Sequence, residues 1–138
     1  MSTIFDKIIS GEIPCHKVAE NNDFLAFLDV FPVQKGHVLV IPKQPVDYIF
    51  NLKNDDFVAL HLFSKKVAEG LKIAVPCKKI GVAVIGLEVP HAHIHLVPMN
   101  AISDMDFSKK IQMSQEELAQ LTLIIKPEID KIVSNSGL

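Results

Sequence analysis

The pattern of apolar and polar residues divides the first third of the chain into one short helix and three extended segments. Residues 3–10 carry apolar side chains at helical spacing, which predicts a helix that Gly11 ends. Residues 16–20 follow a proline and are predicted to be extended. Residues 24–30 are apolar apart from one Asp, and residues 37–41 are rich in β-branched side chains, so both runs predict strands.

The remaining pattern predicts a long helix, two strands and a final helix. One apolar stripe runs from about residue 55 to 73, with the spacing of an amphipathic helix. Residues 80–85 and 91–97 have the length and composition of strands. A Ser-x-x-Glu capping box at residues 114–117 predicts the start of a C-terminal helix, which Pro127 is expected to kink or to divide.

In chain order these elements predict an α+β fold with one sheet of about five strands. The connections between consecutive strands are too short for parallel crossovers, so most strand pairs should be antiparallel. The long helix and the C-terminal helix are expected to pack on one side of the sheet. At 138 residues the chain has the size of one domain, and we expect residues 1–138 to form a single domain.

Composition and net charge limit the classes of function. Apolar residues make up 49% of the chain and charged residues 22%, which is typical of a soluble globular protein. The net charge of -2 argues against nucleic-acid binding through a broad basic surface. No apolar run reaches about 18 residues, and the N-terminus lacks the pattern of a signal peptide. We therefore expect a cytoplasmic protein with no membrane partner.

The cysteines and the basic residues restrict the chemistry further. Cys15 and Cys77 are far apart and form no CxxC pair, so a zinc ribbon is excluded and a disulfide framework is not expected. All 14 basic residues are lysine, and none is arginine. A bound phosphate would therefore depend on backbone N–H groups or on lysine, hydroxyl or imidazole side chains instead of a guanidinium group.

Three of the six histidines alternate within the predicted strand at residues 91–97. Because a strand has a period of two, His91, His93 and His95 should share one face, and the apolar residues between them should face the core. With a rise of about 3.3 Å per residue, the outer Cα atoms would lie roughly 13 Å apart. Two neighbouring imidazoles can therefore reach one zinc ion, but three from one straight strand can hardly converge on it.

Three interpretations of the histidine row compete. The histidines could decorate a solvated face of the sheet, or the His91/His93 pair could hold a metal ion together with ligands from elsewhere. The third interpretation is nucleophilic catalysis, because a neutral imidazole near pH 7 has a free lone pair and needs no separate base. A neighbouring imidazole can then donate a proton to the leaving group.

The segment HAHIHLV (91–97) resembles the His-φ-His-φ-His-φ-φ motif, with φ apolar, of the histidine triad (HIT) superfamily. TIFDKIISGEIP (3–14), FLAFLDV (24–30) and GHVLVIPK (36–43) resemble further blocks of the same family, in the same order and at similar distances. Together these blocks cover roughly residues 3–98. The branch that the chain most resembles is the Hint-like group of nucleoside phosphoramidases.

The resemblance implies covalent chemistry at phosphorus. Such proteins bind a purine nucleoside monophosphate unit, cleave at its α-phosphate and pass through a nucleotidyl-histidine. By its place in the motif His93 is the expected nucleophile, and His95 would help to protonate the leaving group. His91 would orient His93, and His37 matches a further histidine of the family close to the triad. The resemblance implies no metal site and no required cofactor, although a divalent ion could accompany a polyphosphate substrate.

The resemblance also implies a nucleoside site. Asp29 falls where family members accept hydrogen bonds from the two ribose hydroxyls, and a carboxylate suits such a vicinal diol. An apolar slot is the expected environment of a flat purine ring. The residues that match the family's slot are Ile4, Phe5, Ile8, Phe27, Leu28 and Val30. The expected partners are a small purine nucleotide and a second copy of the chain, in a homodimer.

The chain departs from the family pattern just before the histidines. Family members usually carry an Asn on the preceding strand and a Gln before the motif, whereas Leu87 takes the Gln position here and the loop is shorter. Glu88 stands where some members have a hydroxyl that contacts phosphate. The phosphate would then rely on the histidines and on backbone N–H groups near Glu88 and Val89. Residues 99–138 form a C-terminal helical extension in which selectivity is expected to be tuned.

These features predict a purine nucleotide hydrolase or transferase. It would act at the α-phosphate of a nucleoside phosphoramidate, a dinucleoside polyphosphate or another nucleotidyl conjugate. The first alternative is a nucleotide-binding or interaction protein of the same fold with little catalysis. The second alternative is a metal-dependent hydrolase that uses the His91/His93 pair.

Overall fold

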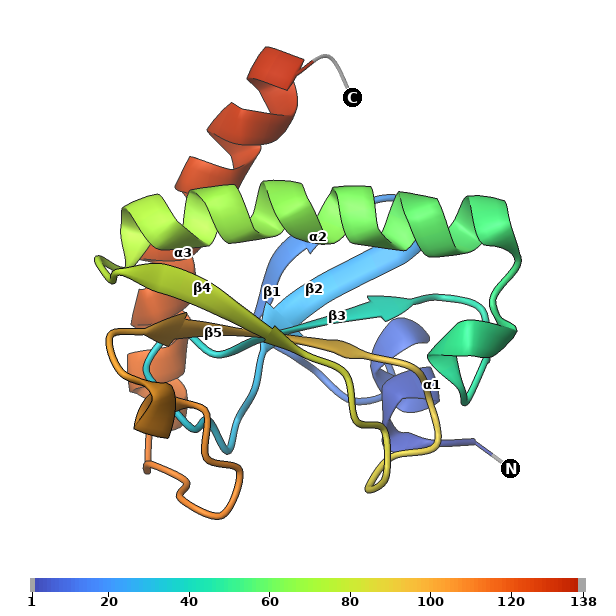
Figure 1. Ribbon diagram of the computed structural model, residues 1–138, viewed down its shortest axis with the longest axis horizontal. Helices are drawn as coiled ribbons and strands as arrows, with labels where there is room; N and C mark the ends of the chain where they lie inside the picture. Colours follow the sequence, from blue (N-terminus) through green and yellow to red (C-terminus); the bar gives the residue numbers. More distant parts are fainter. Residues whose placement is uncertain (1, 137–138) are drawn as a thin grey trace.

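The fold is an antiparallel sheet between layers of helix, seen in a computed structural model that describes residues 2–136 (Figure 1). In chain order the elements are α1 (Ile4–Ile9), β1 (Lys17–Glu20), β2 (Phe24–Leu28), β3 (Val38–Pro42), η1 (Ile49–Asn51), α2 (Asn54–Ala74), β4 (Lys79–Ala83), β5 (Ile94–Met99), η2 (Ile102–Asp104) and α3 (Gln115–Ser136). The strand order is β1-β2-β3-β5-β4, and every neighbouring pair is antiparallel. The predicted α+β fold with a five-stranded antiparallel sheet is therefore confirmed.

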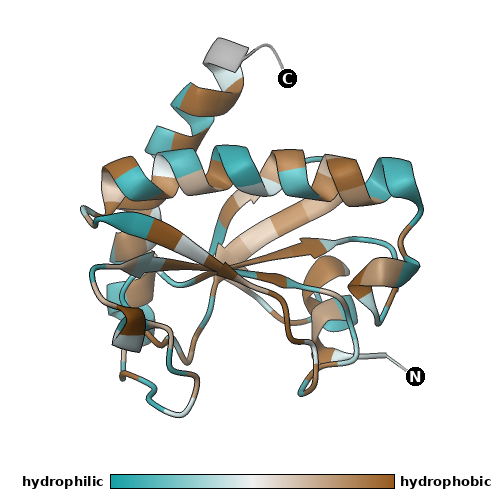
Figure 2. Ribbon diagram, viewed as in Figure 1, coloured by the Kyte–Doolittle hydropathy of each residue, from teal (hydrophilic) through white to brown (hydrophobic). Residues whose placement is uncertain are grey.

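The two long helices cover one face of the sheet. In Figure 1, α2 lies across the sheet, and α3 contacts both α2 and β1. The main core between these layers includes Leu60, Val67 and Leu71 of α2, Leu121, Ile125 and Ile129 of α3, and Val40, Ile94 and Leu96 of the sheet. Figure 2 shows strands that are mainly apolar and an α2 along which apolar and polar residues alternate. Within residues 2–136, no helix is both long and apolar enough to cross a membrane.

The short helix α1 packs on the opposite face of the sheet. Its buried residues Phe5 and Ile8 join a second apolar cluster with Leu25, Phe27 and Leu39 from β2 and β3. Every residue of these two strands is buried, so both faces of the sheet are apolar at its centre and both need cover. The expectation that the long helix and the C-terminal helix pack on one side is therefore confirmed, and α1, for which no side was predicted, covers the other face.

Capping boxes fix the start of two helices. At α1 the Asp6 N–H donates to the Thr3 hydroxyl at 3.1 Å, and the Thr3 N–H donates to the Asp6 carboxylate at 2.9 Å. The predicted box before α3 is confirmed, because Glu117 N–H donates to the Ser114 hydroxyl at 3.0 Å and Ser114 N–H donates to the Glu117 carboxylate at 2.9 Å. Pro127 lies inside α3 and does not divide it, because apolar residues on both sides of it are buried in the same core.

The last strand begins later than the sequence pattern predicts. β5 spans Ile94–Met99, so His91 and His93 precede the strand instead of lying within it. Beyond the ladder with β3, the Ala92 N–H donates to the carbonyl of Val46 at 2.7 Å, in the loop that follows β3. The expected row of three histidines on one strand is therefore wrong, since tertiary hydrogen bonds place the first two.

A close contact between α2 and α3 at Gly70 generates a stability prediction. A Cβ built on Gly70 would lie 2.6 Å from the Cα and 2.7 Å from the backbone N of Ile129. We predict that Gly70→Ala lowers the free energy of unfolding by about 1–3 kcal/mol, because overpacking must push the helices apart. This loss should appear although alanine favours a helix by about 1 kcal/mol over glycine. Urea unfolding measures it, with Glu69→Ala at the exposed neighbouring position as control; a more stable Gly70→Ala protein would contradict the prediction.

Candidate functional site

A cavity of about 610 Å³ opens on the α1 side of the sheet. All residues predicted for the base, ribose and leaving-group regions line it: Ile4, Phe5, Ile8, Phe27, Leu28, Asp29, Val30, Leu87, Glu88 and Val89. His93 and His95 also line the cavity, whereas His37 and His91 are fully buried next to them. The fold therefore gathers at one cavity side chains that are far apart in the sequence.

The backbone fixes the tautomer of His93. Its Nδ1 lies 2.7 Å from the carbonyl oxygen of His91, which can only accept a hydrogen bond, so Nδ1 carries the proton. The Nε2 atom of the neutral ring therefore keeps its lone pair. The Phe5 ring packs edge-on against the imidazole, with 5.1 Å between centroids. His93 thus has the tautomer and the fixed orientation that a nucleophile requires.

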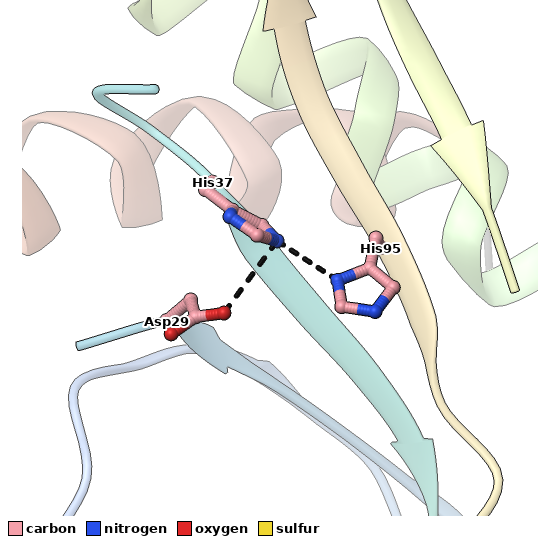
Figure 3. A group of neighbouring side chains, drawn as sticks. All are labelled: Asp29, His37 and His95. Atoms are coloured by element: carbon pink, nitrogen blue, oxygen red, sulfur yellow. Dashed lines mark hydrogen bonds and ion pairs between the residues drawn. The ribbon is translucent and has the colours of Figure 1, made fainter. Parts of the chain in front are cut away.

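His37 and His95 form a hydrogen-bonded chain (Figure 3). The backbone N–H of Val33 donates to His37 Nδ1 at 3.1 Å, so the proton of the neutral His37 ring is on Nε2. His37 Nε2 lies 2.9 Å from Nδ1 of His95 and donates to it. The proton of neutral His95 is therefore on its own Nε2. A single backbone N–H thereby sets the tautomer of two rings in succession.

The two imidazoles that line the cavity are consequently in opposite tautomers. The rings of His93 and His95 lie 4.9 Å apart between centroids and are inclined by 66°. His93 provides a lone pair that can attack an electrophile. His95 provides an N–H that can stabilise negative charge on a departing group. This pairing of an electron-pair donor with a proton donor suits substitution at an electrophilic centre such as phosphorus.

A tight turn before β3 brings His37 to this position. Gly36 has a φ of 90°, a conformation that glycine adopts without the steric cost of a Cβ. A Cβ on Gly36 would also lie 3.1 Å from side-chain atoms of Pro98 and Val75. After the turn, the Asp29 N–H donates to the His37 carbonyl at 3.0 Å, which closes the loop onto the end of β2. Asp29 and His37 are thereby held side by side.

Burial keeps the three site histidines neutral. Burial, together with the charges of His95 and Lys110, lowers the pKa of His37 to about 3. Burial likewise lowers the pKa of His95 to about 4. The pKa of His93 is lowered mainly by burial, against which the hydrogen bond to the His91 carbonyl acts. All three rings are therefore neutral at pH 7, as their tautomers require.

His91 contacts His93 through its backbone, and its ring is directed elsewhere. The ring Nε2 donates to the carbonyl oxygen of Pro42 at 2.8 Å, and Nδ1 lies 3.6 Å from the Asp6 carboxylate. The Phe5 ring packs edge-on against it at 5.8 Å between centroids. The ring thus attaches the segment before β5 to β3 and α1, while the carbonyl oxygen orients His93.

Asp29 lies just after β2, where its carboxylate borders the cavity. One oxygen, Oδ1, accepts from the Phe31 N–H at 2.8 Å, and Oδ2 lies 3.6 Å from His37 Nε2 (Figure 3). Burial raises the pKa of Asp29, whereas the Phe31 N–H and the charge of Lys110 act against this rise. Because the backbone uses only one oxygen, the carboxylate can still accept hydrogen bonds from a ligand in the cavity.

Aromatic rings from α1 and β2 form the apolar wall of the cavity. Phe5 and Phe27 pack edge to face with 5.7 Å between centroids, which suits a flat apolar group beside them. Elsewhere in the cavity lining, Leu87 is 88% exposed and Glu88 is exposed. Among the hydrogen bonds of residues 2–136, none is donated by the backbone N–H of Glu88 or Val89, so both groups are available to an anion.

The sequence pattern missed part of the cavity wall. The residues not singled out are Ile13, Pro14, Cys15, Phe31, Leu39, Ile85, Gly86, Phe107 and Lys110. Phe107 and Lys110 belong to the segment after β5, and the Phe107 ring packs against His95 at 4.7 Å between centroids. This irregular segment has no periodicity from which its position could be predicted. The one feature of the sequence that could have indicated a role for this segment is Phe107, an isolated aromatic residue close to Lys109 and Lys110 in a chain without arginine.

One group of side chains has the spacing of a metal site. Ligand atoms of Asp29, His37 and His95 all lie within 4.8 Å of one another (Figure 3). The hydrogen bonds disfavour an ion here, because His37 Nε2 carries a proton as long as Nδ1 accepts from Val33. The His91/His93 pair is not gathered around a common position either, since the ring nitrogens of His91 face β3 and α1.

Comparison with known proteins gives a consistent picture. Residues 10–102 match the sequence profile of the HIT domain. An uncharacterized HIT-like protein of Mycoplasma genitalium is 38% identical over 104 residues, which cover 70% of this chain and 72% of that protein. An adenosine 5′-monophosphoramidase of Schizosaccharomyces pombe is 37% identical over 103 residues, which cover 71% of this chain and 74% of that protein.

A solved structure extends the comparison to the whole fold. The crystal structure of a hypothetical histidine triad nucleotide-binding protein from Sulfolobus tokodaii superposes with a TM-score of 0.83. It is 28% identical in sequence, and the match covers 97% of this chain and 96% of that chain. The match therefore includes the segment after β5 as well as the region of the histidines.

The neutral histidines generate a prediction about stability and pH. In the unfolded chain His37 and His95 take up protons near pH 6.5, whereas in the folded protein they stay neutral until about pH 3 and about pH 4. The unfolded state therefore binds more protons as the pH falls below about 6.5. We predict that the free energy of unfolding decreases by about 1.4 kcal/mol per pH unit for each of these rings over this range.

Urea unfolding between about pH 5 and pH 7.5 measures this slope. His37→Asn removes one of the rings and should reduce the slope by about one proton. His61→Asn is the matched control, because His61 is exposed on α2. A His37→Asn protein with the same slope as the wild type would contradict the assignment of a neutral buried His37.

Proposed function

The chain belongs to the HIT domain family, and from this membership and the geometry of the cavity we propose that it is a purine nucleotide hydrolase or transferase. It acts at the α-phosphate of a nucleoside phosphoramidate or a related nucleotide, such as a dinucleoside polyphosphate or another nucleotidyl conjugate. The observation that carries the proposal is the opposite tautomers of His93 and His95 in one cavity.

The proposed roles of the lining residues give the bound nucleotide one orientation. The base enters the apolar part beside Phe5 and Phe27, and the ribose hydroxyls donate to Asp29. The α-phosphate then lies at His93, and the free backbone N–H groups of Glu88 and Val89 bind its oxygens. The fission yeast relative supports this substrate class, since it is named as an adenosine 5′-monophosphoramidase.

The reaction proceeds in two displacements at phosphorus. The lone pair of His93 Nε2 forms a bond to phosphorus, and the bond to the leaving group breaks as that group takes the electron pair. The His95 N–H stabilises the charge that develops on the leaving atom; an amine takes the His95 Nε2 proton as it departs, whereas a leaving group that is stable as an anion departs without it. Water then attacks the nucleotidyl-His93, the electron pair of the P–N bond returns to the ring, and the proton of water passes to His95 where that ring gave one up, or otherwise to solvent. Holding these groups in place provides most of the rate.

Two alternatives use the same fold differently. A nucleotide-binding protein with little catalysis would need the apolar slot and Asp29, but not a lone pair and an N–H side by side on neighbouring rings. A metal-dependent hydrolase would need His91 and His93 to share an ion, whereas the His91 ring bonds to Pro42. We propose that the covalent step requires no cofactor, and that a divalent ion accompanies only a polyphosphate substrate.

We predict that His93→Ala loses turnover of adenosine 5′-phosphoramidate by at least about 10³-fold, because the nucleophile is gone. Mass spectrometry of quenched wild-type reactions should detect a mass increase of one adenylyl group, which is absent in His93→Ala. His61→Ala, on the exposed side of α2, is the control variant and should keep both turnover and adduct.

The same assay decides between the alternatives. Equal turnover by His93→Ala and wild type would refute the role of His93. Binding of nucleotide without turnover or adduct across a panel of substrates would favour the binding protein. Activity that EDTA abolishes and zinc restores would overturn the covalent mechanism in favour of the metal-dependent hydrolase.

We also propose that the chain forms a homodimer through the β4 edge of the sheet. β1, at the other edge, contacts α3, so β4 is the edge available for pairing among the described strands. Val82 on β4 is 61% exposed, and α2 next to it exposes Val58 and Leu62. An edge strand with exposed apolar side chains favours association with a second copy of the same surface.

We predict that Val82→Lys converts the dimer to a monomer, because the lysine places like charges opposite each other at a symmetric interface. Light scattering after size exclusion should give twice the chain mass of 15.3 kDa for wild type and the single mass for the variant. Leu123→Lys is the control, because Leu123 is 75% exposed on α3, which contacts β1 at the other edge of the sheet. A monomeric wild-type protein would refute the proposed dimer.

A further inference from the structure

Local turns hold the segment after β5 against the cavity. The Lys109 N–H donates to the Asp106 carbonyl at 3.0 Å, and the Asp106 carboxylate accepts from the backbone and hydroxyl of Ser108. The Ile111 N–H then donates to the carbonyl of Pro32 at 2.8 Å, in the loop that follows Asp29. This segment is therefore attached to the loop that carries the site residues.

The segment places an aromatic ring and a positive charge beside His95. The Phe107 ring packs edge-on against His95 at 4.7 Å and against His37 at 6.1 Å between centroids. The Nζ atom of Lys110 lies 5.5 Å from the centre of the Phe107 ring, in the range of a cation–π contact. Lys110, Phe107 and His95 thus follow one another along the same wall of the cavity.

Lys110 provides the one positively charged side chain among the described residues that line the cavity. Asp29 and Glu88 are the acidic residues of the wall, yet neither lies within ion-pair distance of Lys110 among residues 2–136. The neighbouring Lys109 differs, because its Nζ lies 3.8 Å from the Asp106 carboxylate. The positive charge of Lys110 also lowers the pKa of His37 and of His95.

Whether the positive charge of Lys110 can assist the reaction depends on the chemistry of the leaving group. In the proposed reaction the leaving group departs with an electron pair on the side of His95. A neutral imidazole N–H stabilises such a group by a hydrogen bond but is a weak acid. A leaving group that is stable as an anion therefore needs a positive charge more than it needs a proton. Lys110 lines the cavity together with the histidine that faces this group, and the Phe107 ring contacts both residues.

We propose that Lys110 binds the leaving group and makes the site selective for nucleotides whose leaving group is itself an anion, such as a nucleoside diphosphate. This inference rests on the proposed function, because it assigns a role to a residue in the same reaction. The segment before the histidines lacks polar donors, because Leu87 and Glu88 stand there. The positive charge of Lys110 compensates for these missing donors. Phe107, which packs edge-on against His95, contacts Lys110 through the cation–π interaction and so holds the charge on this side of the cavity.

Two substrates that share the adenosine α-phosphate test the proposal. Diadenosine triphosphate releases the anion ADP, whereas adenosine 5′-phosphoramidate releases ammonia. We expect Lys110→Met to lower the ratio of kcat/KM for the triphosphate to kcat/KM for the phosphoramidate by about 10-fold or more, since a hydrogen bond to a charged group is lost. Lys110→Arg should restore most of the ratio, and added salt should lower it more in wild type than in Lys110→Met.

Lys109→Met is the matched control, because Lys109 pairs with Asp106 and does not line the cavity. An unchanged ratio in Lys110→Met would overturn the inference, and so would an equal loss on both substrates, which would indicate a contact with the α-phosphate or a structural role. Wild-type protein that cleaves only the phosphoramidate would overturn the inference and leave the proposed function intact. Wild-type protein without turnover or adduct on either substrate would overturn both.

Discussion

The hydrogen bond from the Val33 N–H to His37 Nδ1 is the constraint on which the chemistry of the site depends. It forces the His37 proton onto Nε2, which donates to His95 and in turn forces the His95 proton towards the cavity. The carbonyl oxygen of His91 has the converse effect on His93, because an acceptor at Nδ1 leaves Nε2 with a lone pair. Two backbone groups of opposite polarity thus assign opposite roles to two identical side chains.

This assignment holds only because the rings are buried. Burial excludes water that would otherwise exchange partners with the imidazoles, and it keeps their charged forms unfavourable. The same burial makes the site a source of acid sensitivity, since neutral rings that protonate in the unfolded chain oppose folding at low pH. The apolar cover that α1 provides through Phe5 is therefore part of the electrostatics of the site as well as of its packing.

The two faces of the sheet have different roles: one holds the main core, and the other holds the cavity. The face under α2 and α3 holds the main core and gives the sheet a fixed shape, with helices that approach as closely as Gly70 and Ile129. The other face is covered only by a short helix and by loops, which leaves room for the cavity. Strand ends and loops that border it can vary in sequence without disturbing the core. Leu87, Glu88 and Lys110 lie at such places.

The order of the elements and the antiparallel sheet could be predicted from the sequence. Periodicity carries this information, because apolar faces must be buried whatever the details of packing. Family resemblance supplied the residues expected at the cavity and the roles expected of Asp29 and of the histidines, because no periodic signal distinguishes such residues from core residues.

The nitrogen of each imidazole that carries a proton, and the presence of Phe107 and Lys110 in the cavity wall, follow from the tertiary structure alone. The partners that fix the histidines are backbone groups of Val33, His91 and Pro42, and a backbone group is the same in every sequence. The start of β5 and the positions of Phe107 and Lys110 depend likewise on hydrogen bonds to Val46 and Pro32 in other loops. Periodicity records which side chains are buried, whereas tautomers and loop positions depend on contacts that form only after the chain has folded.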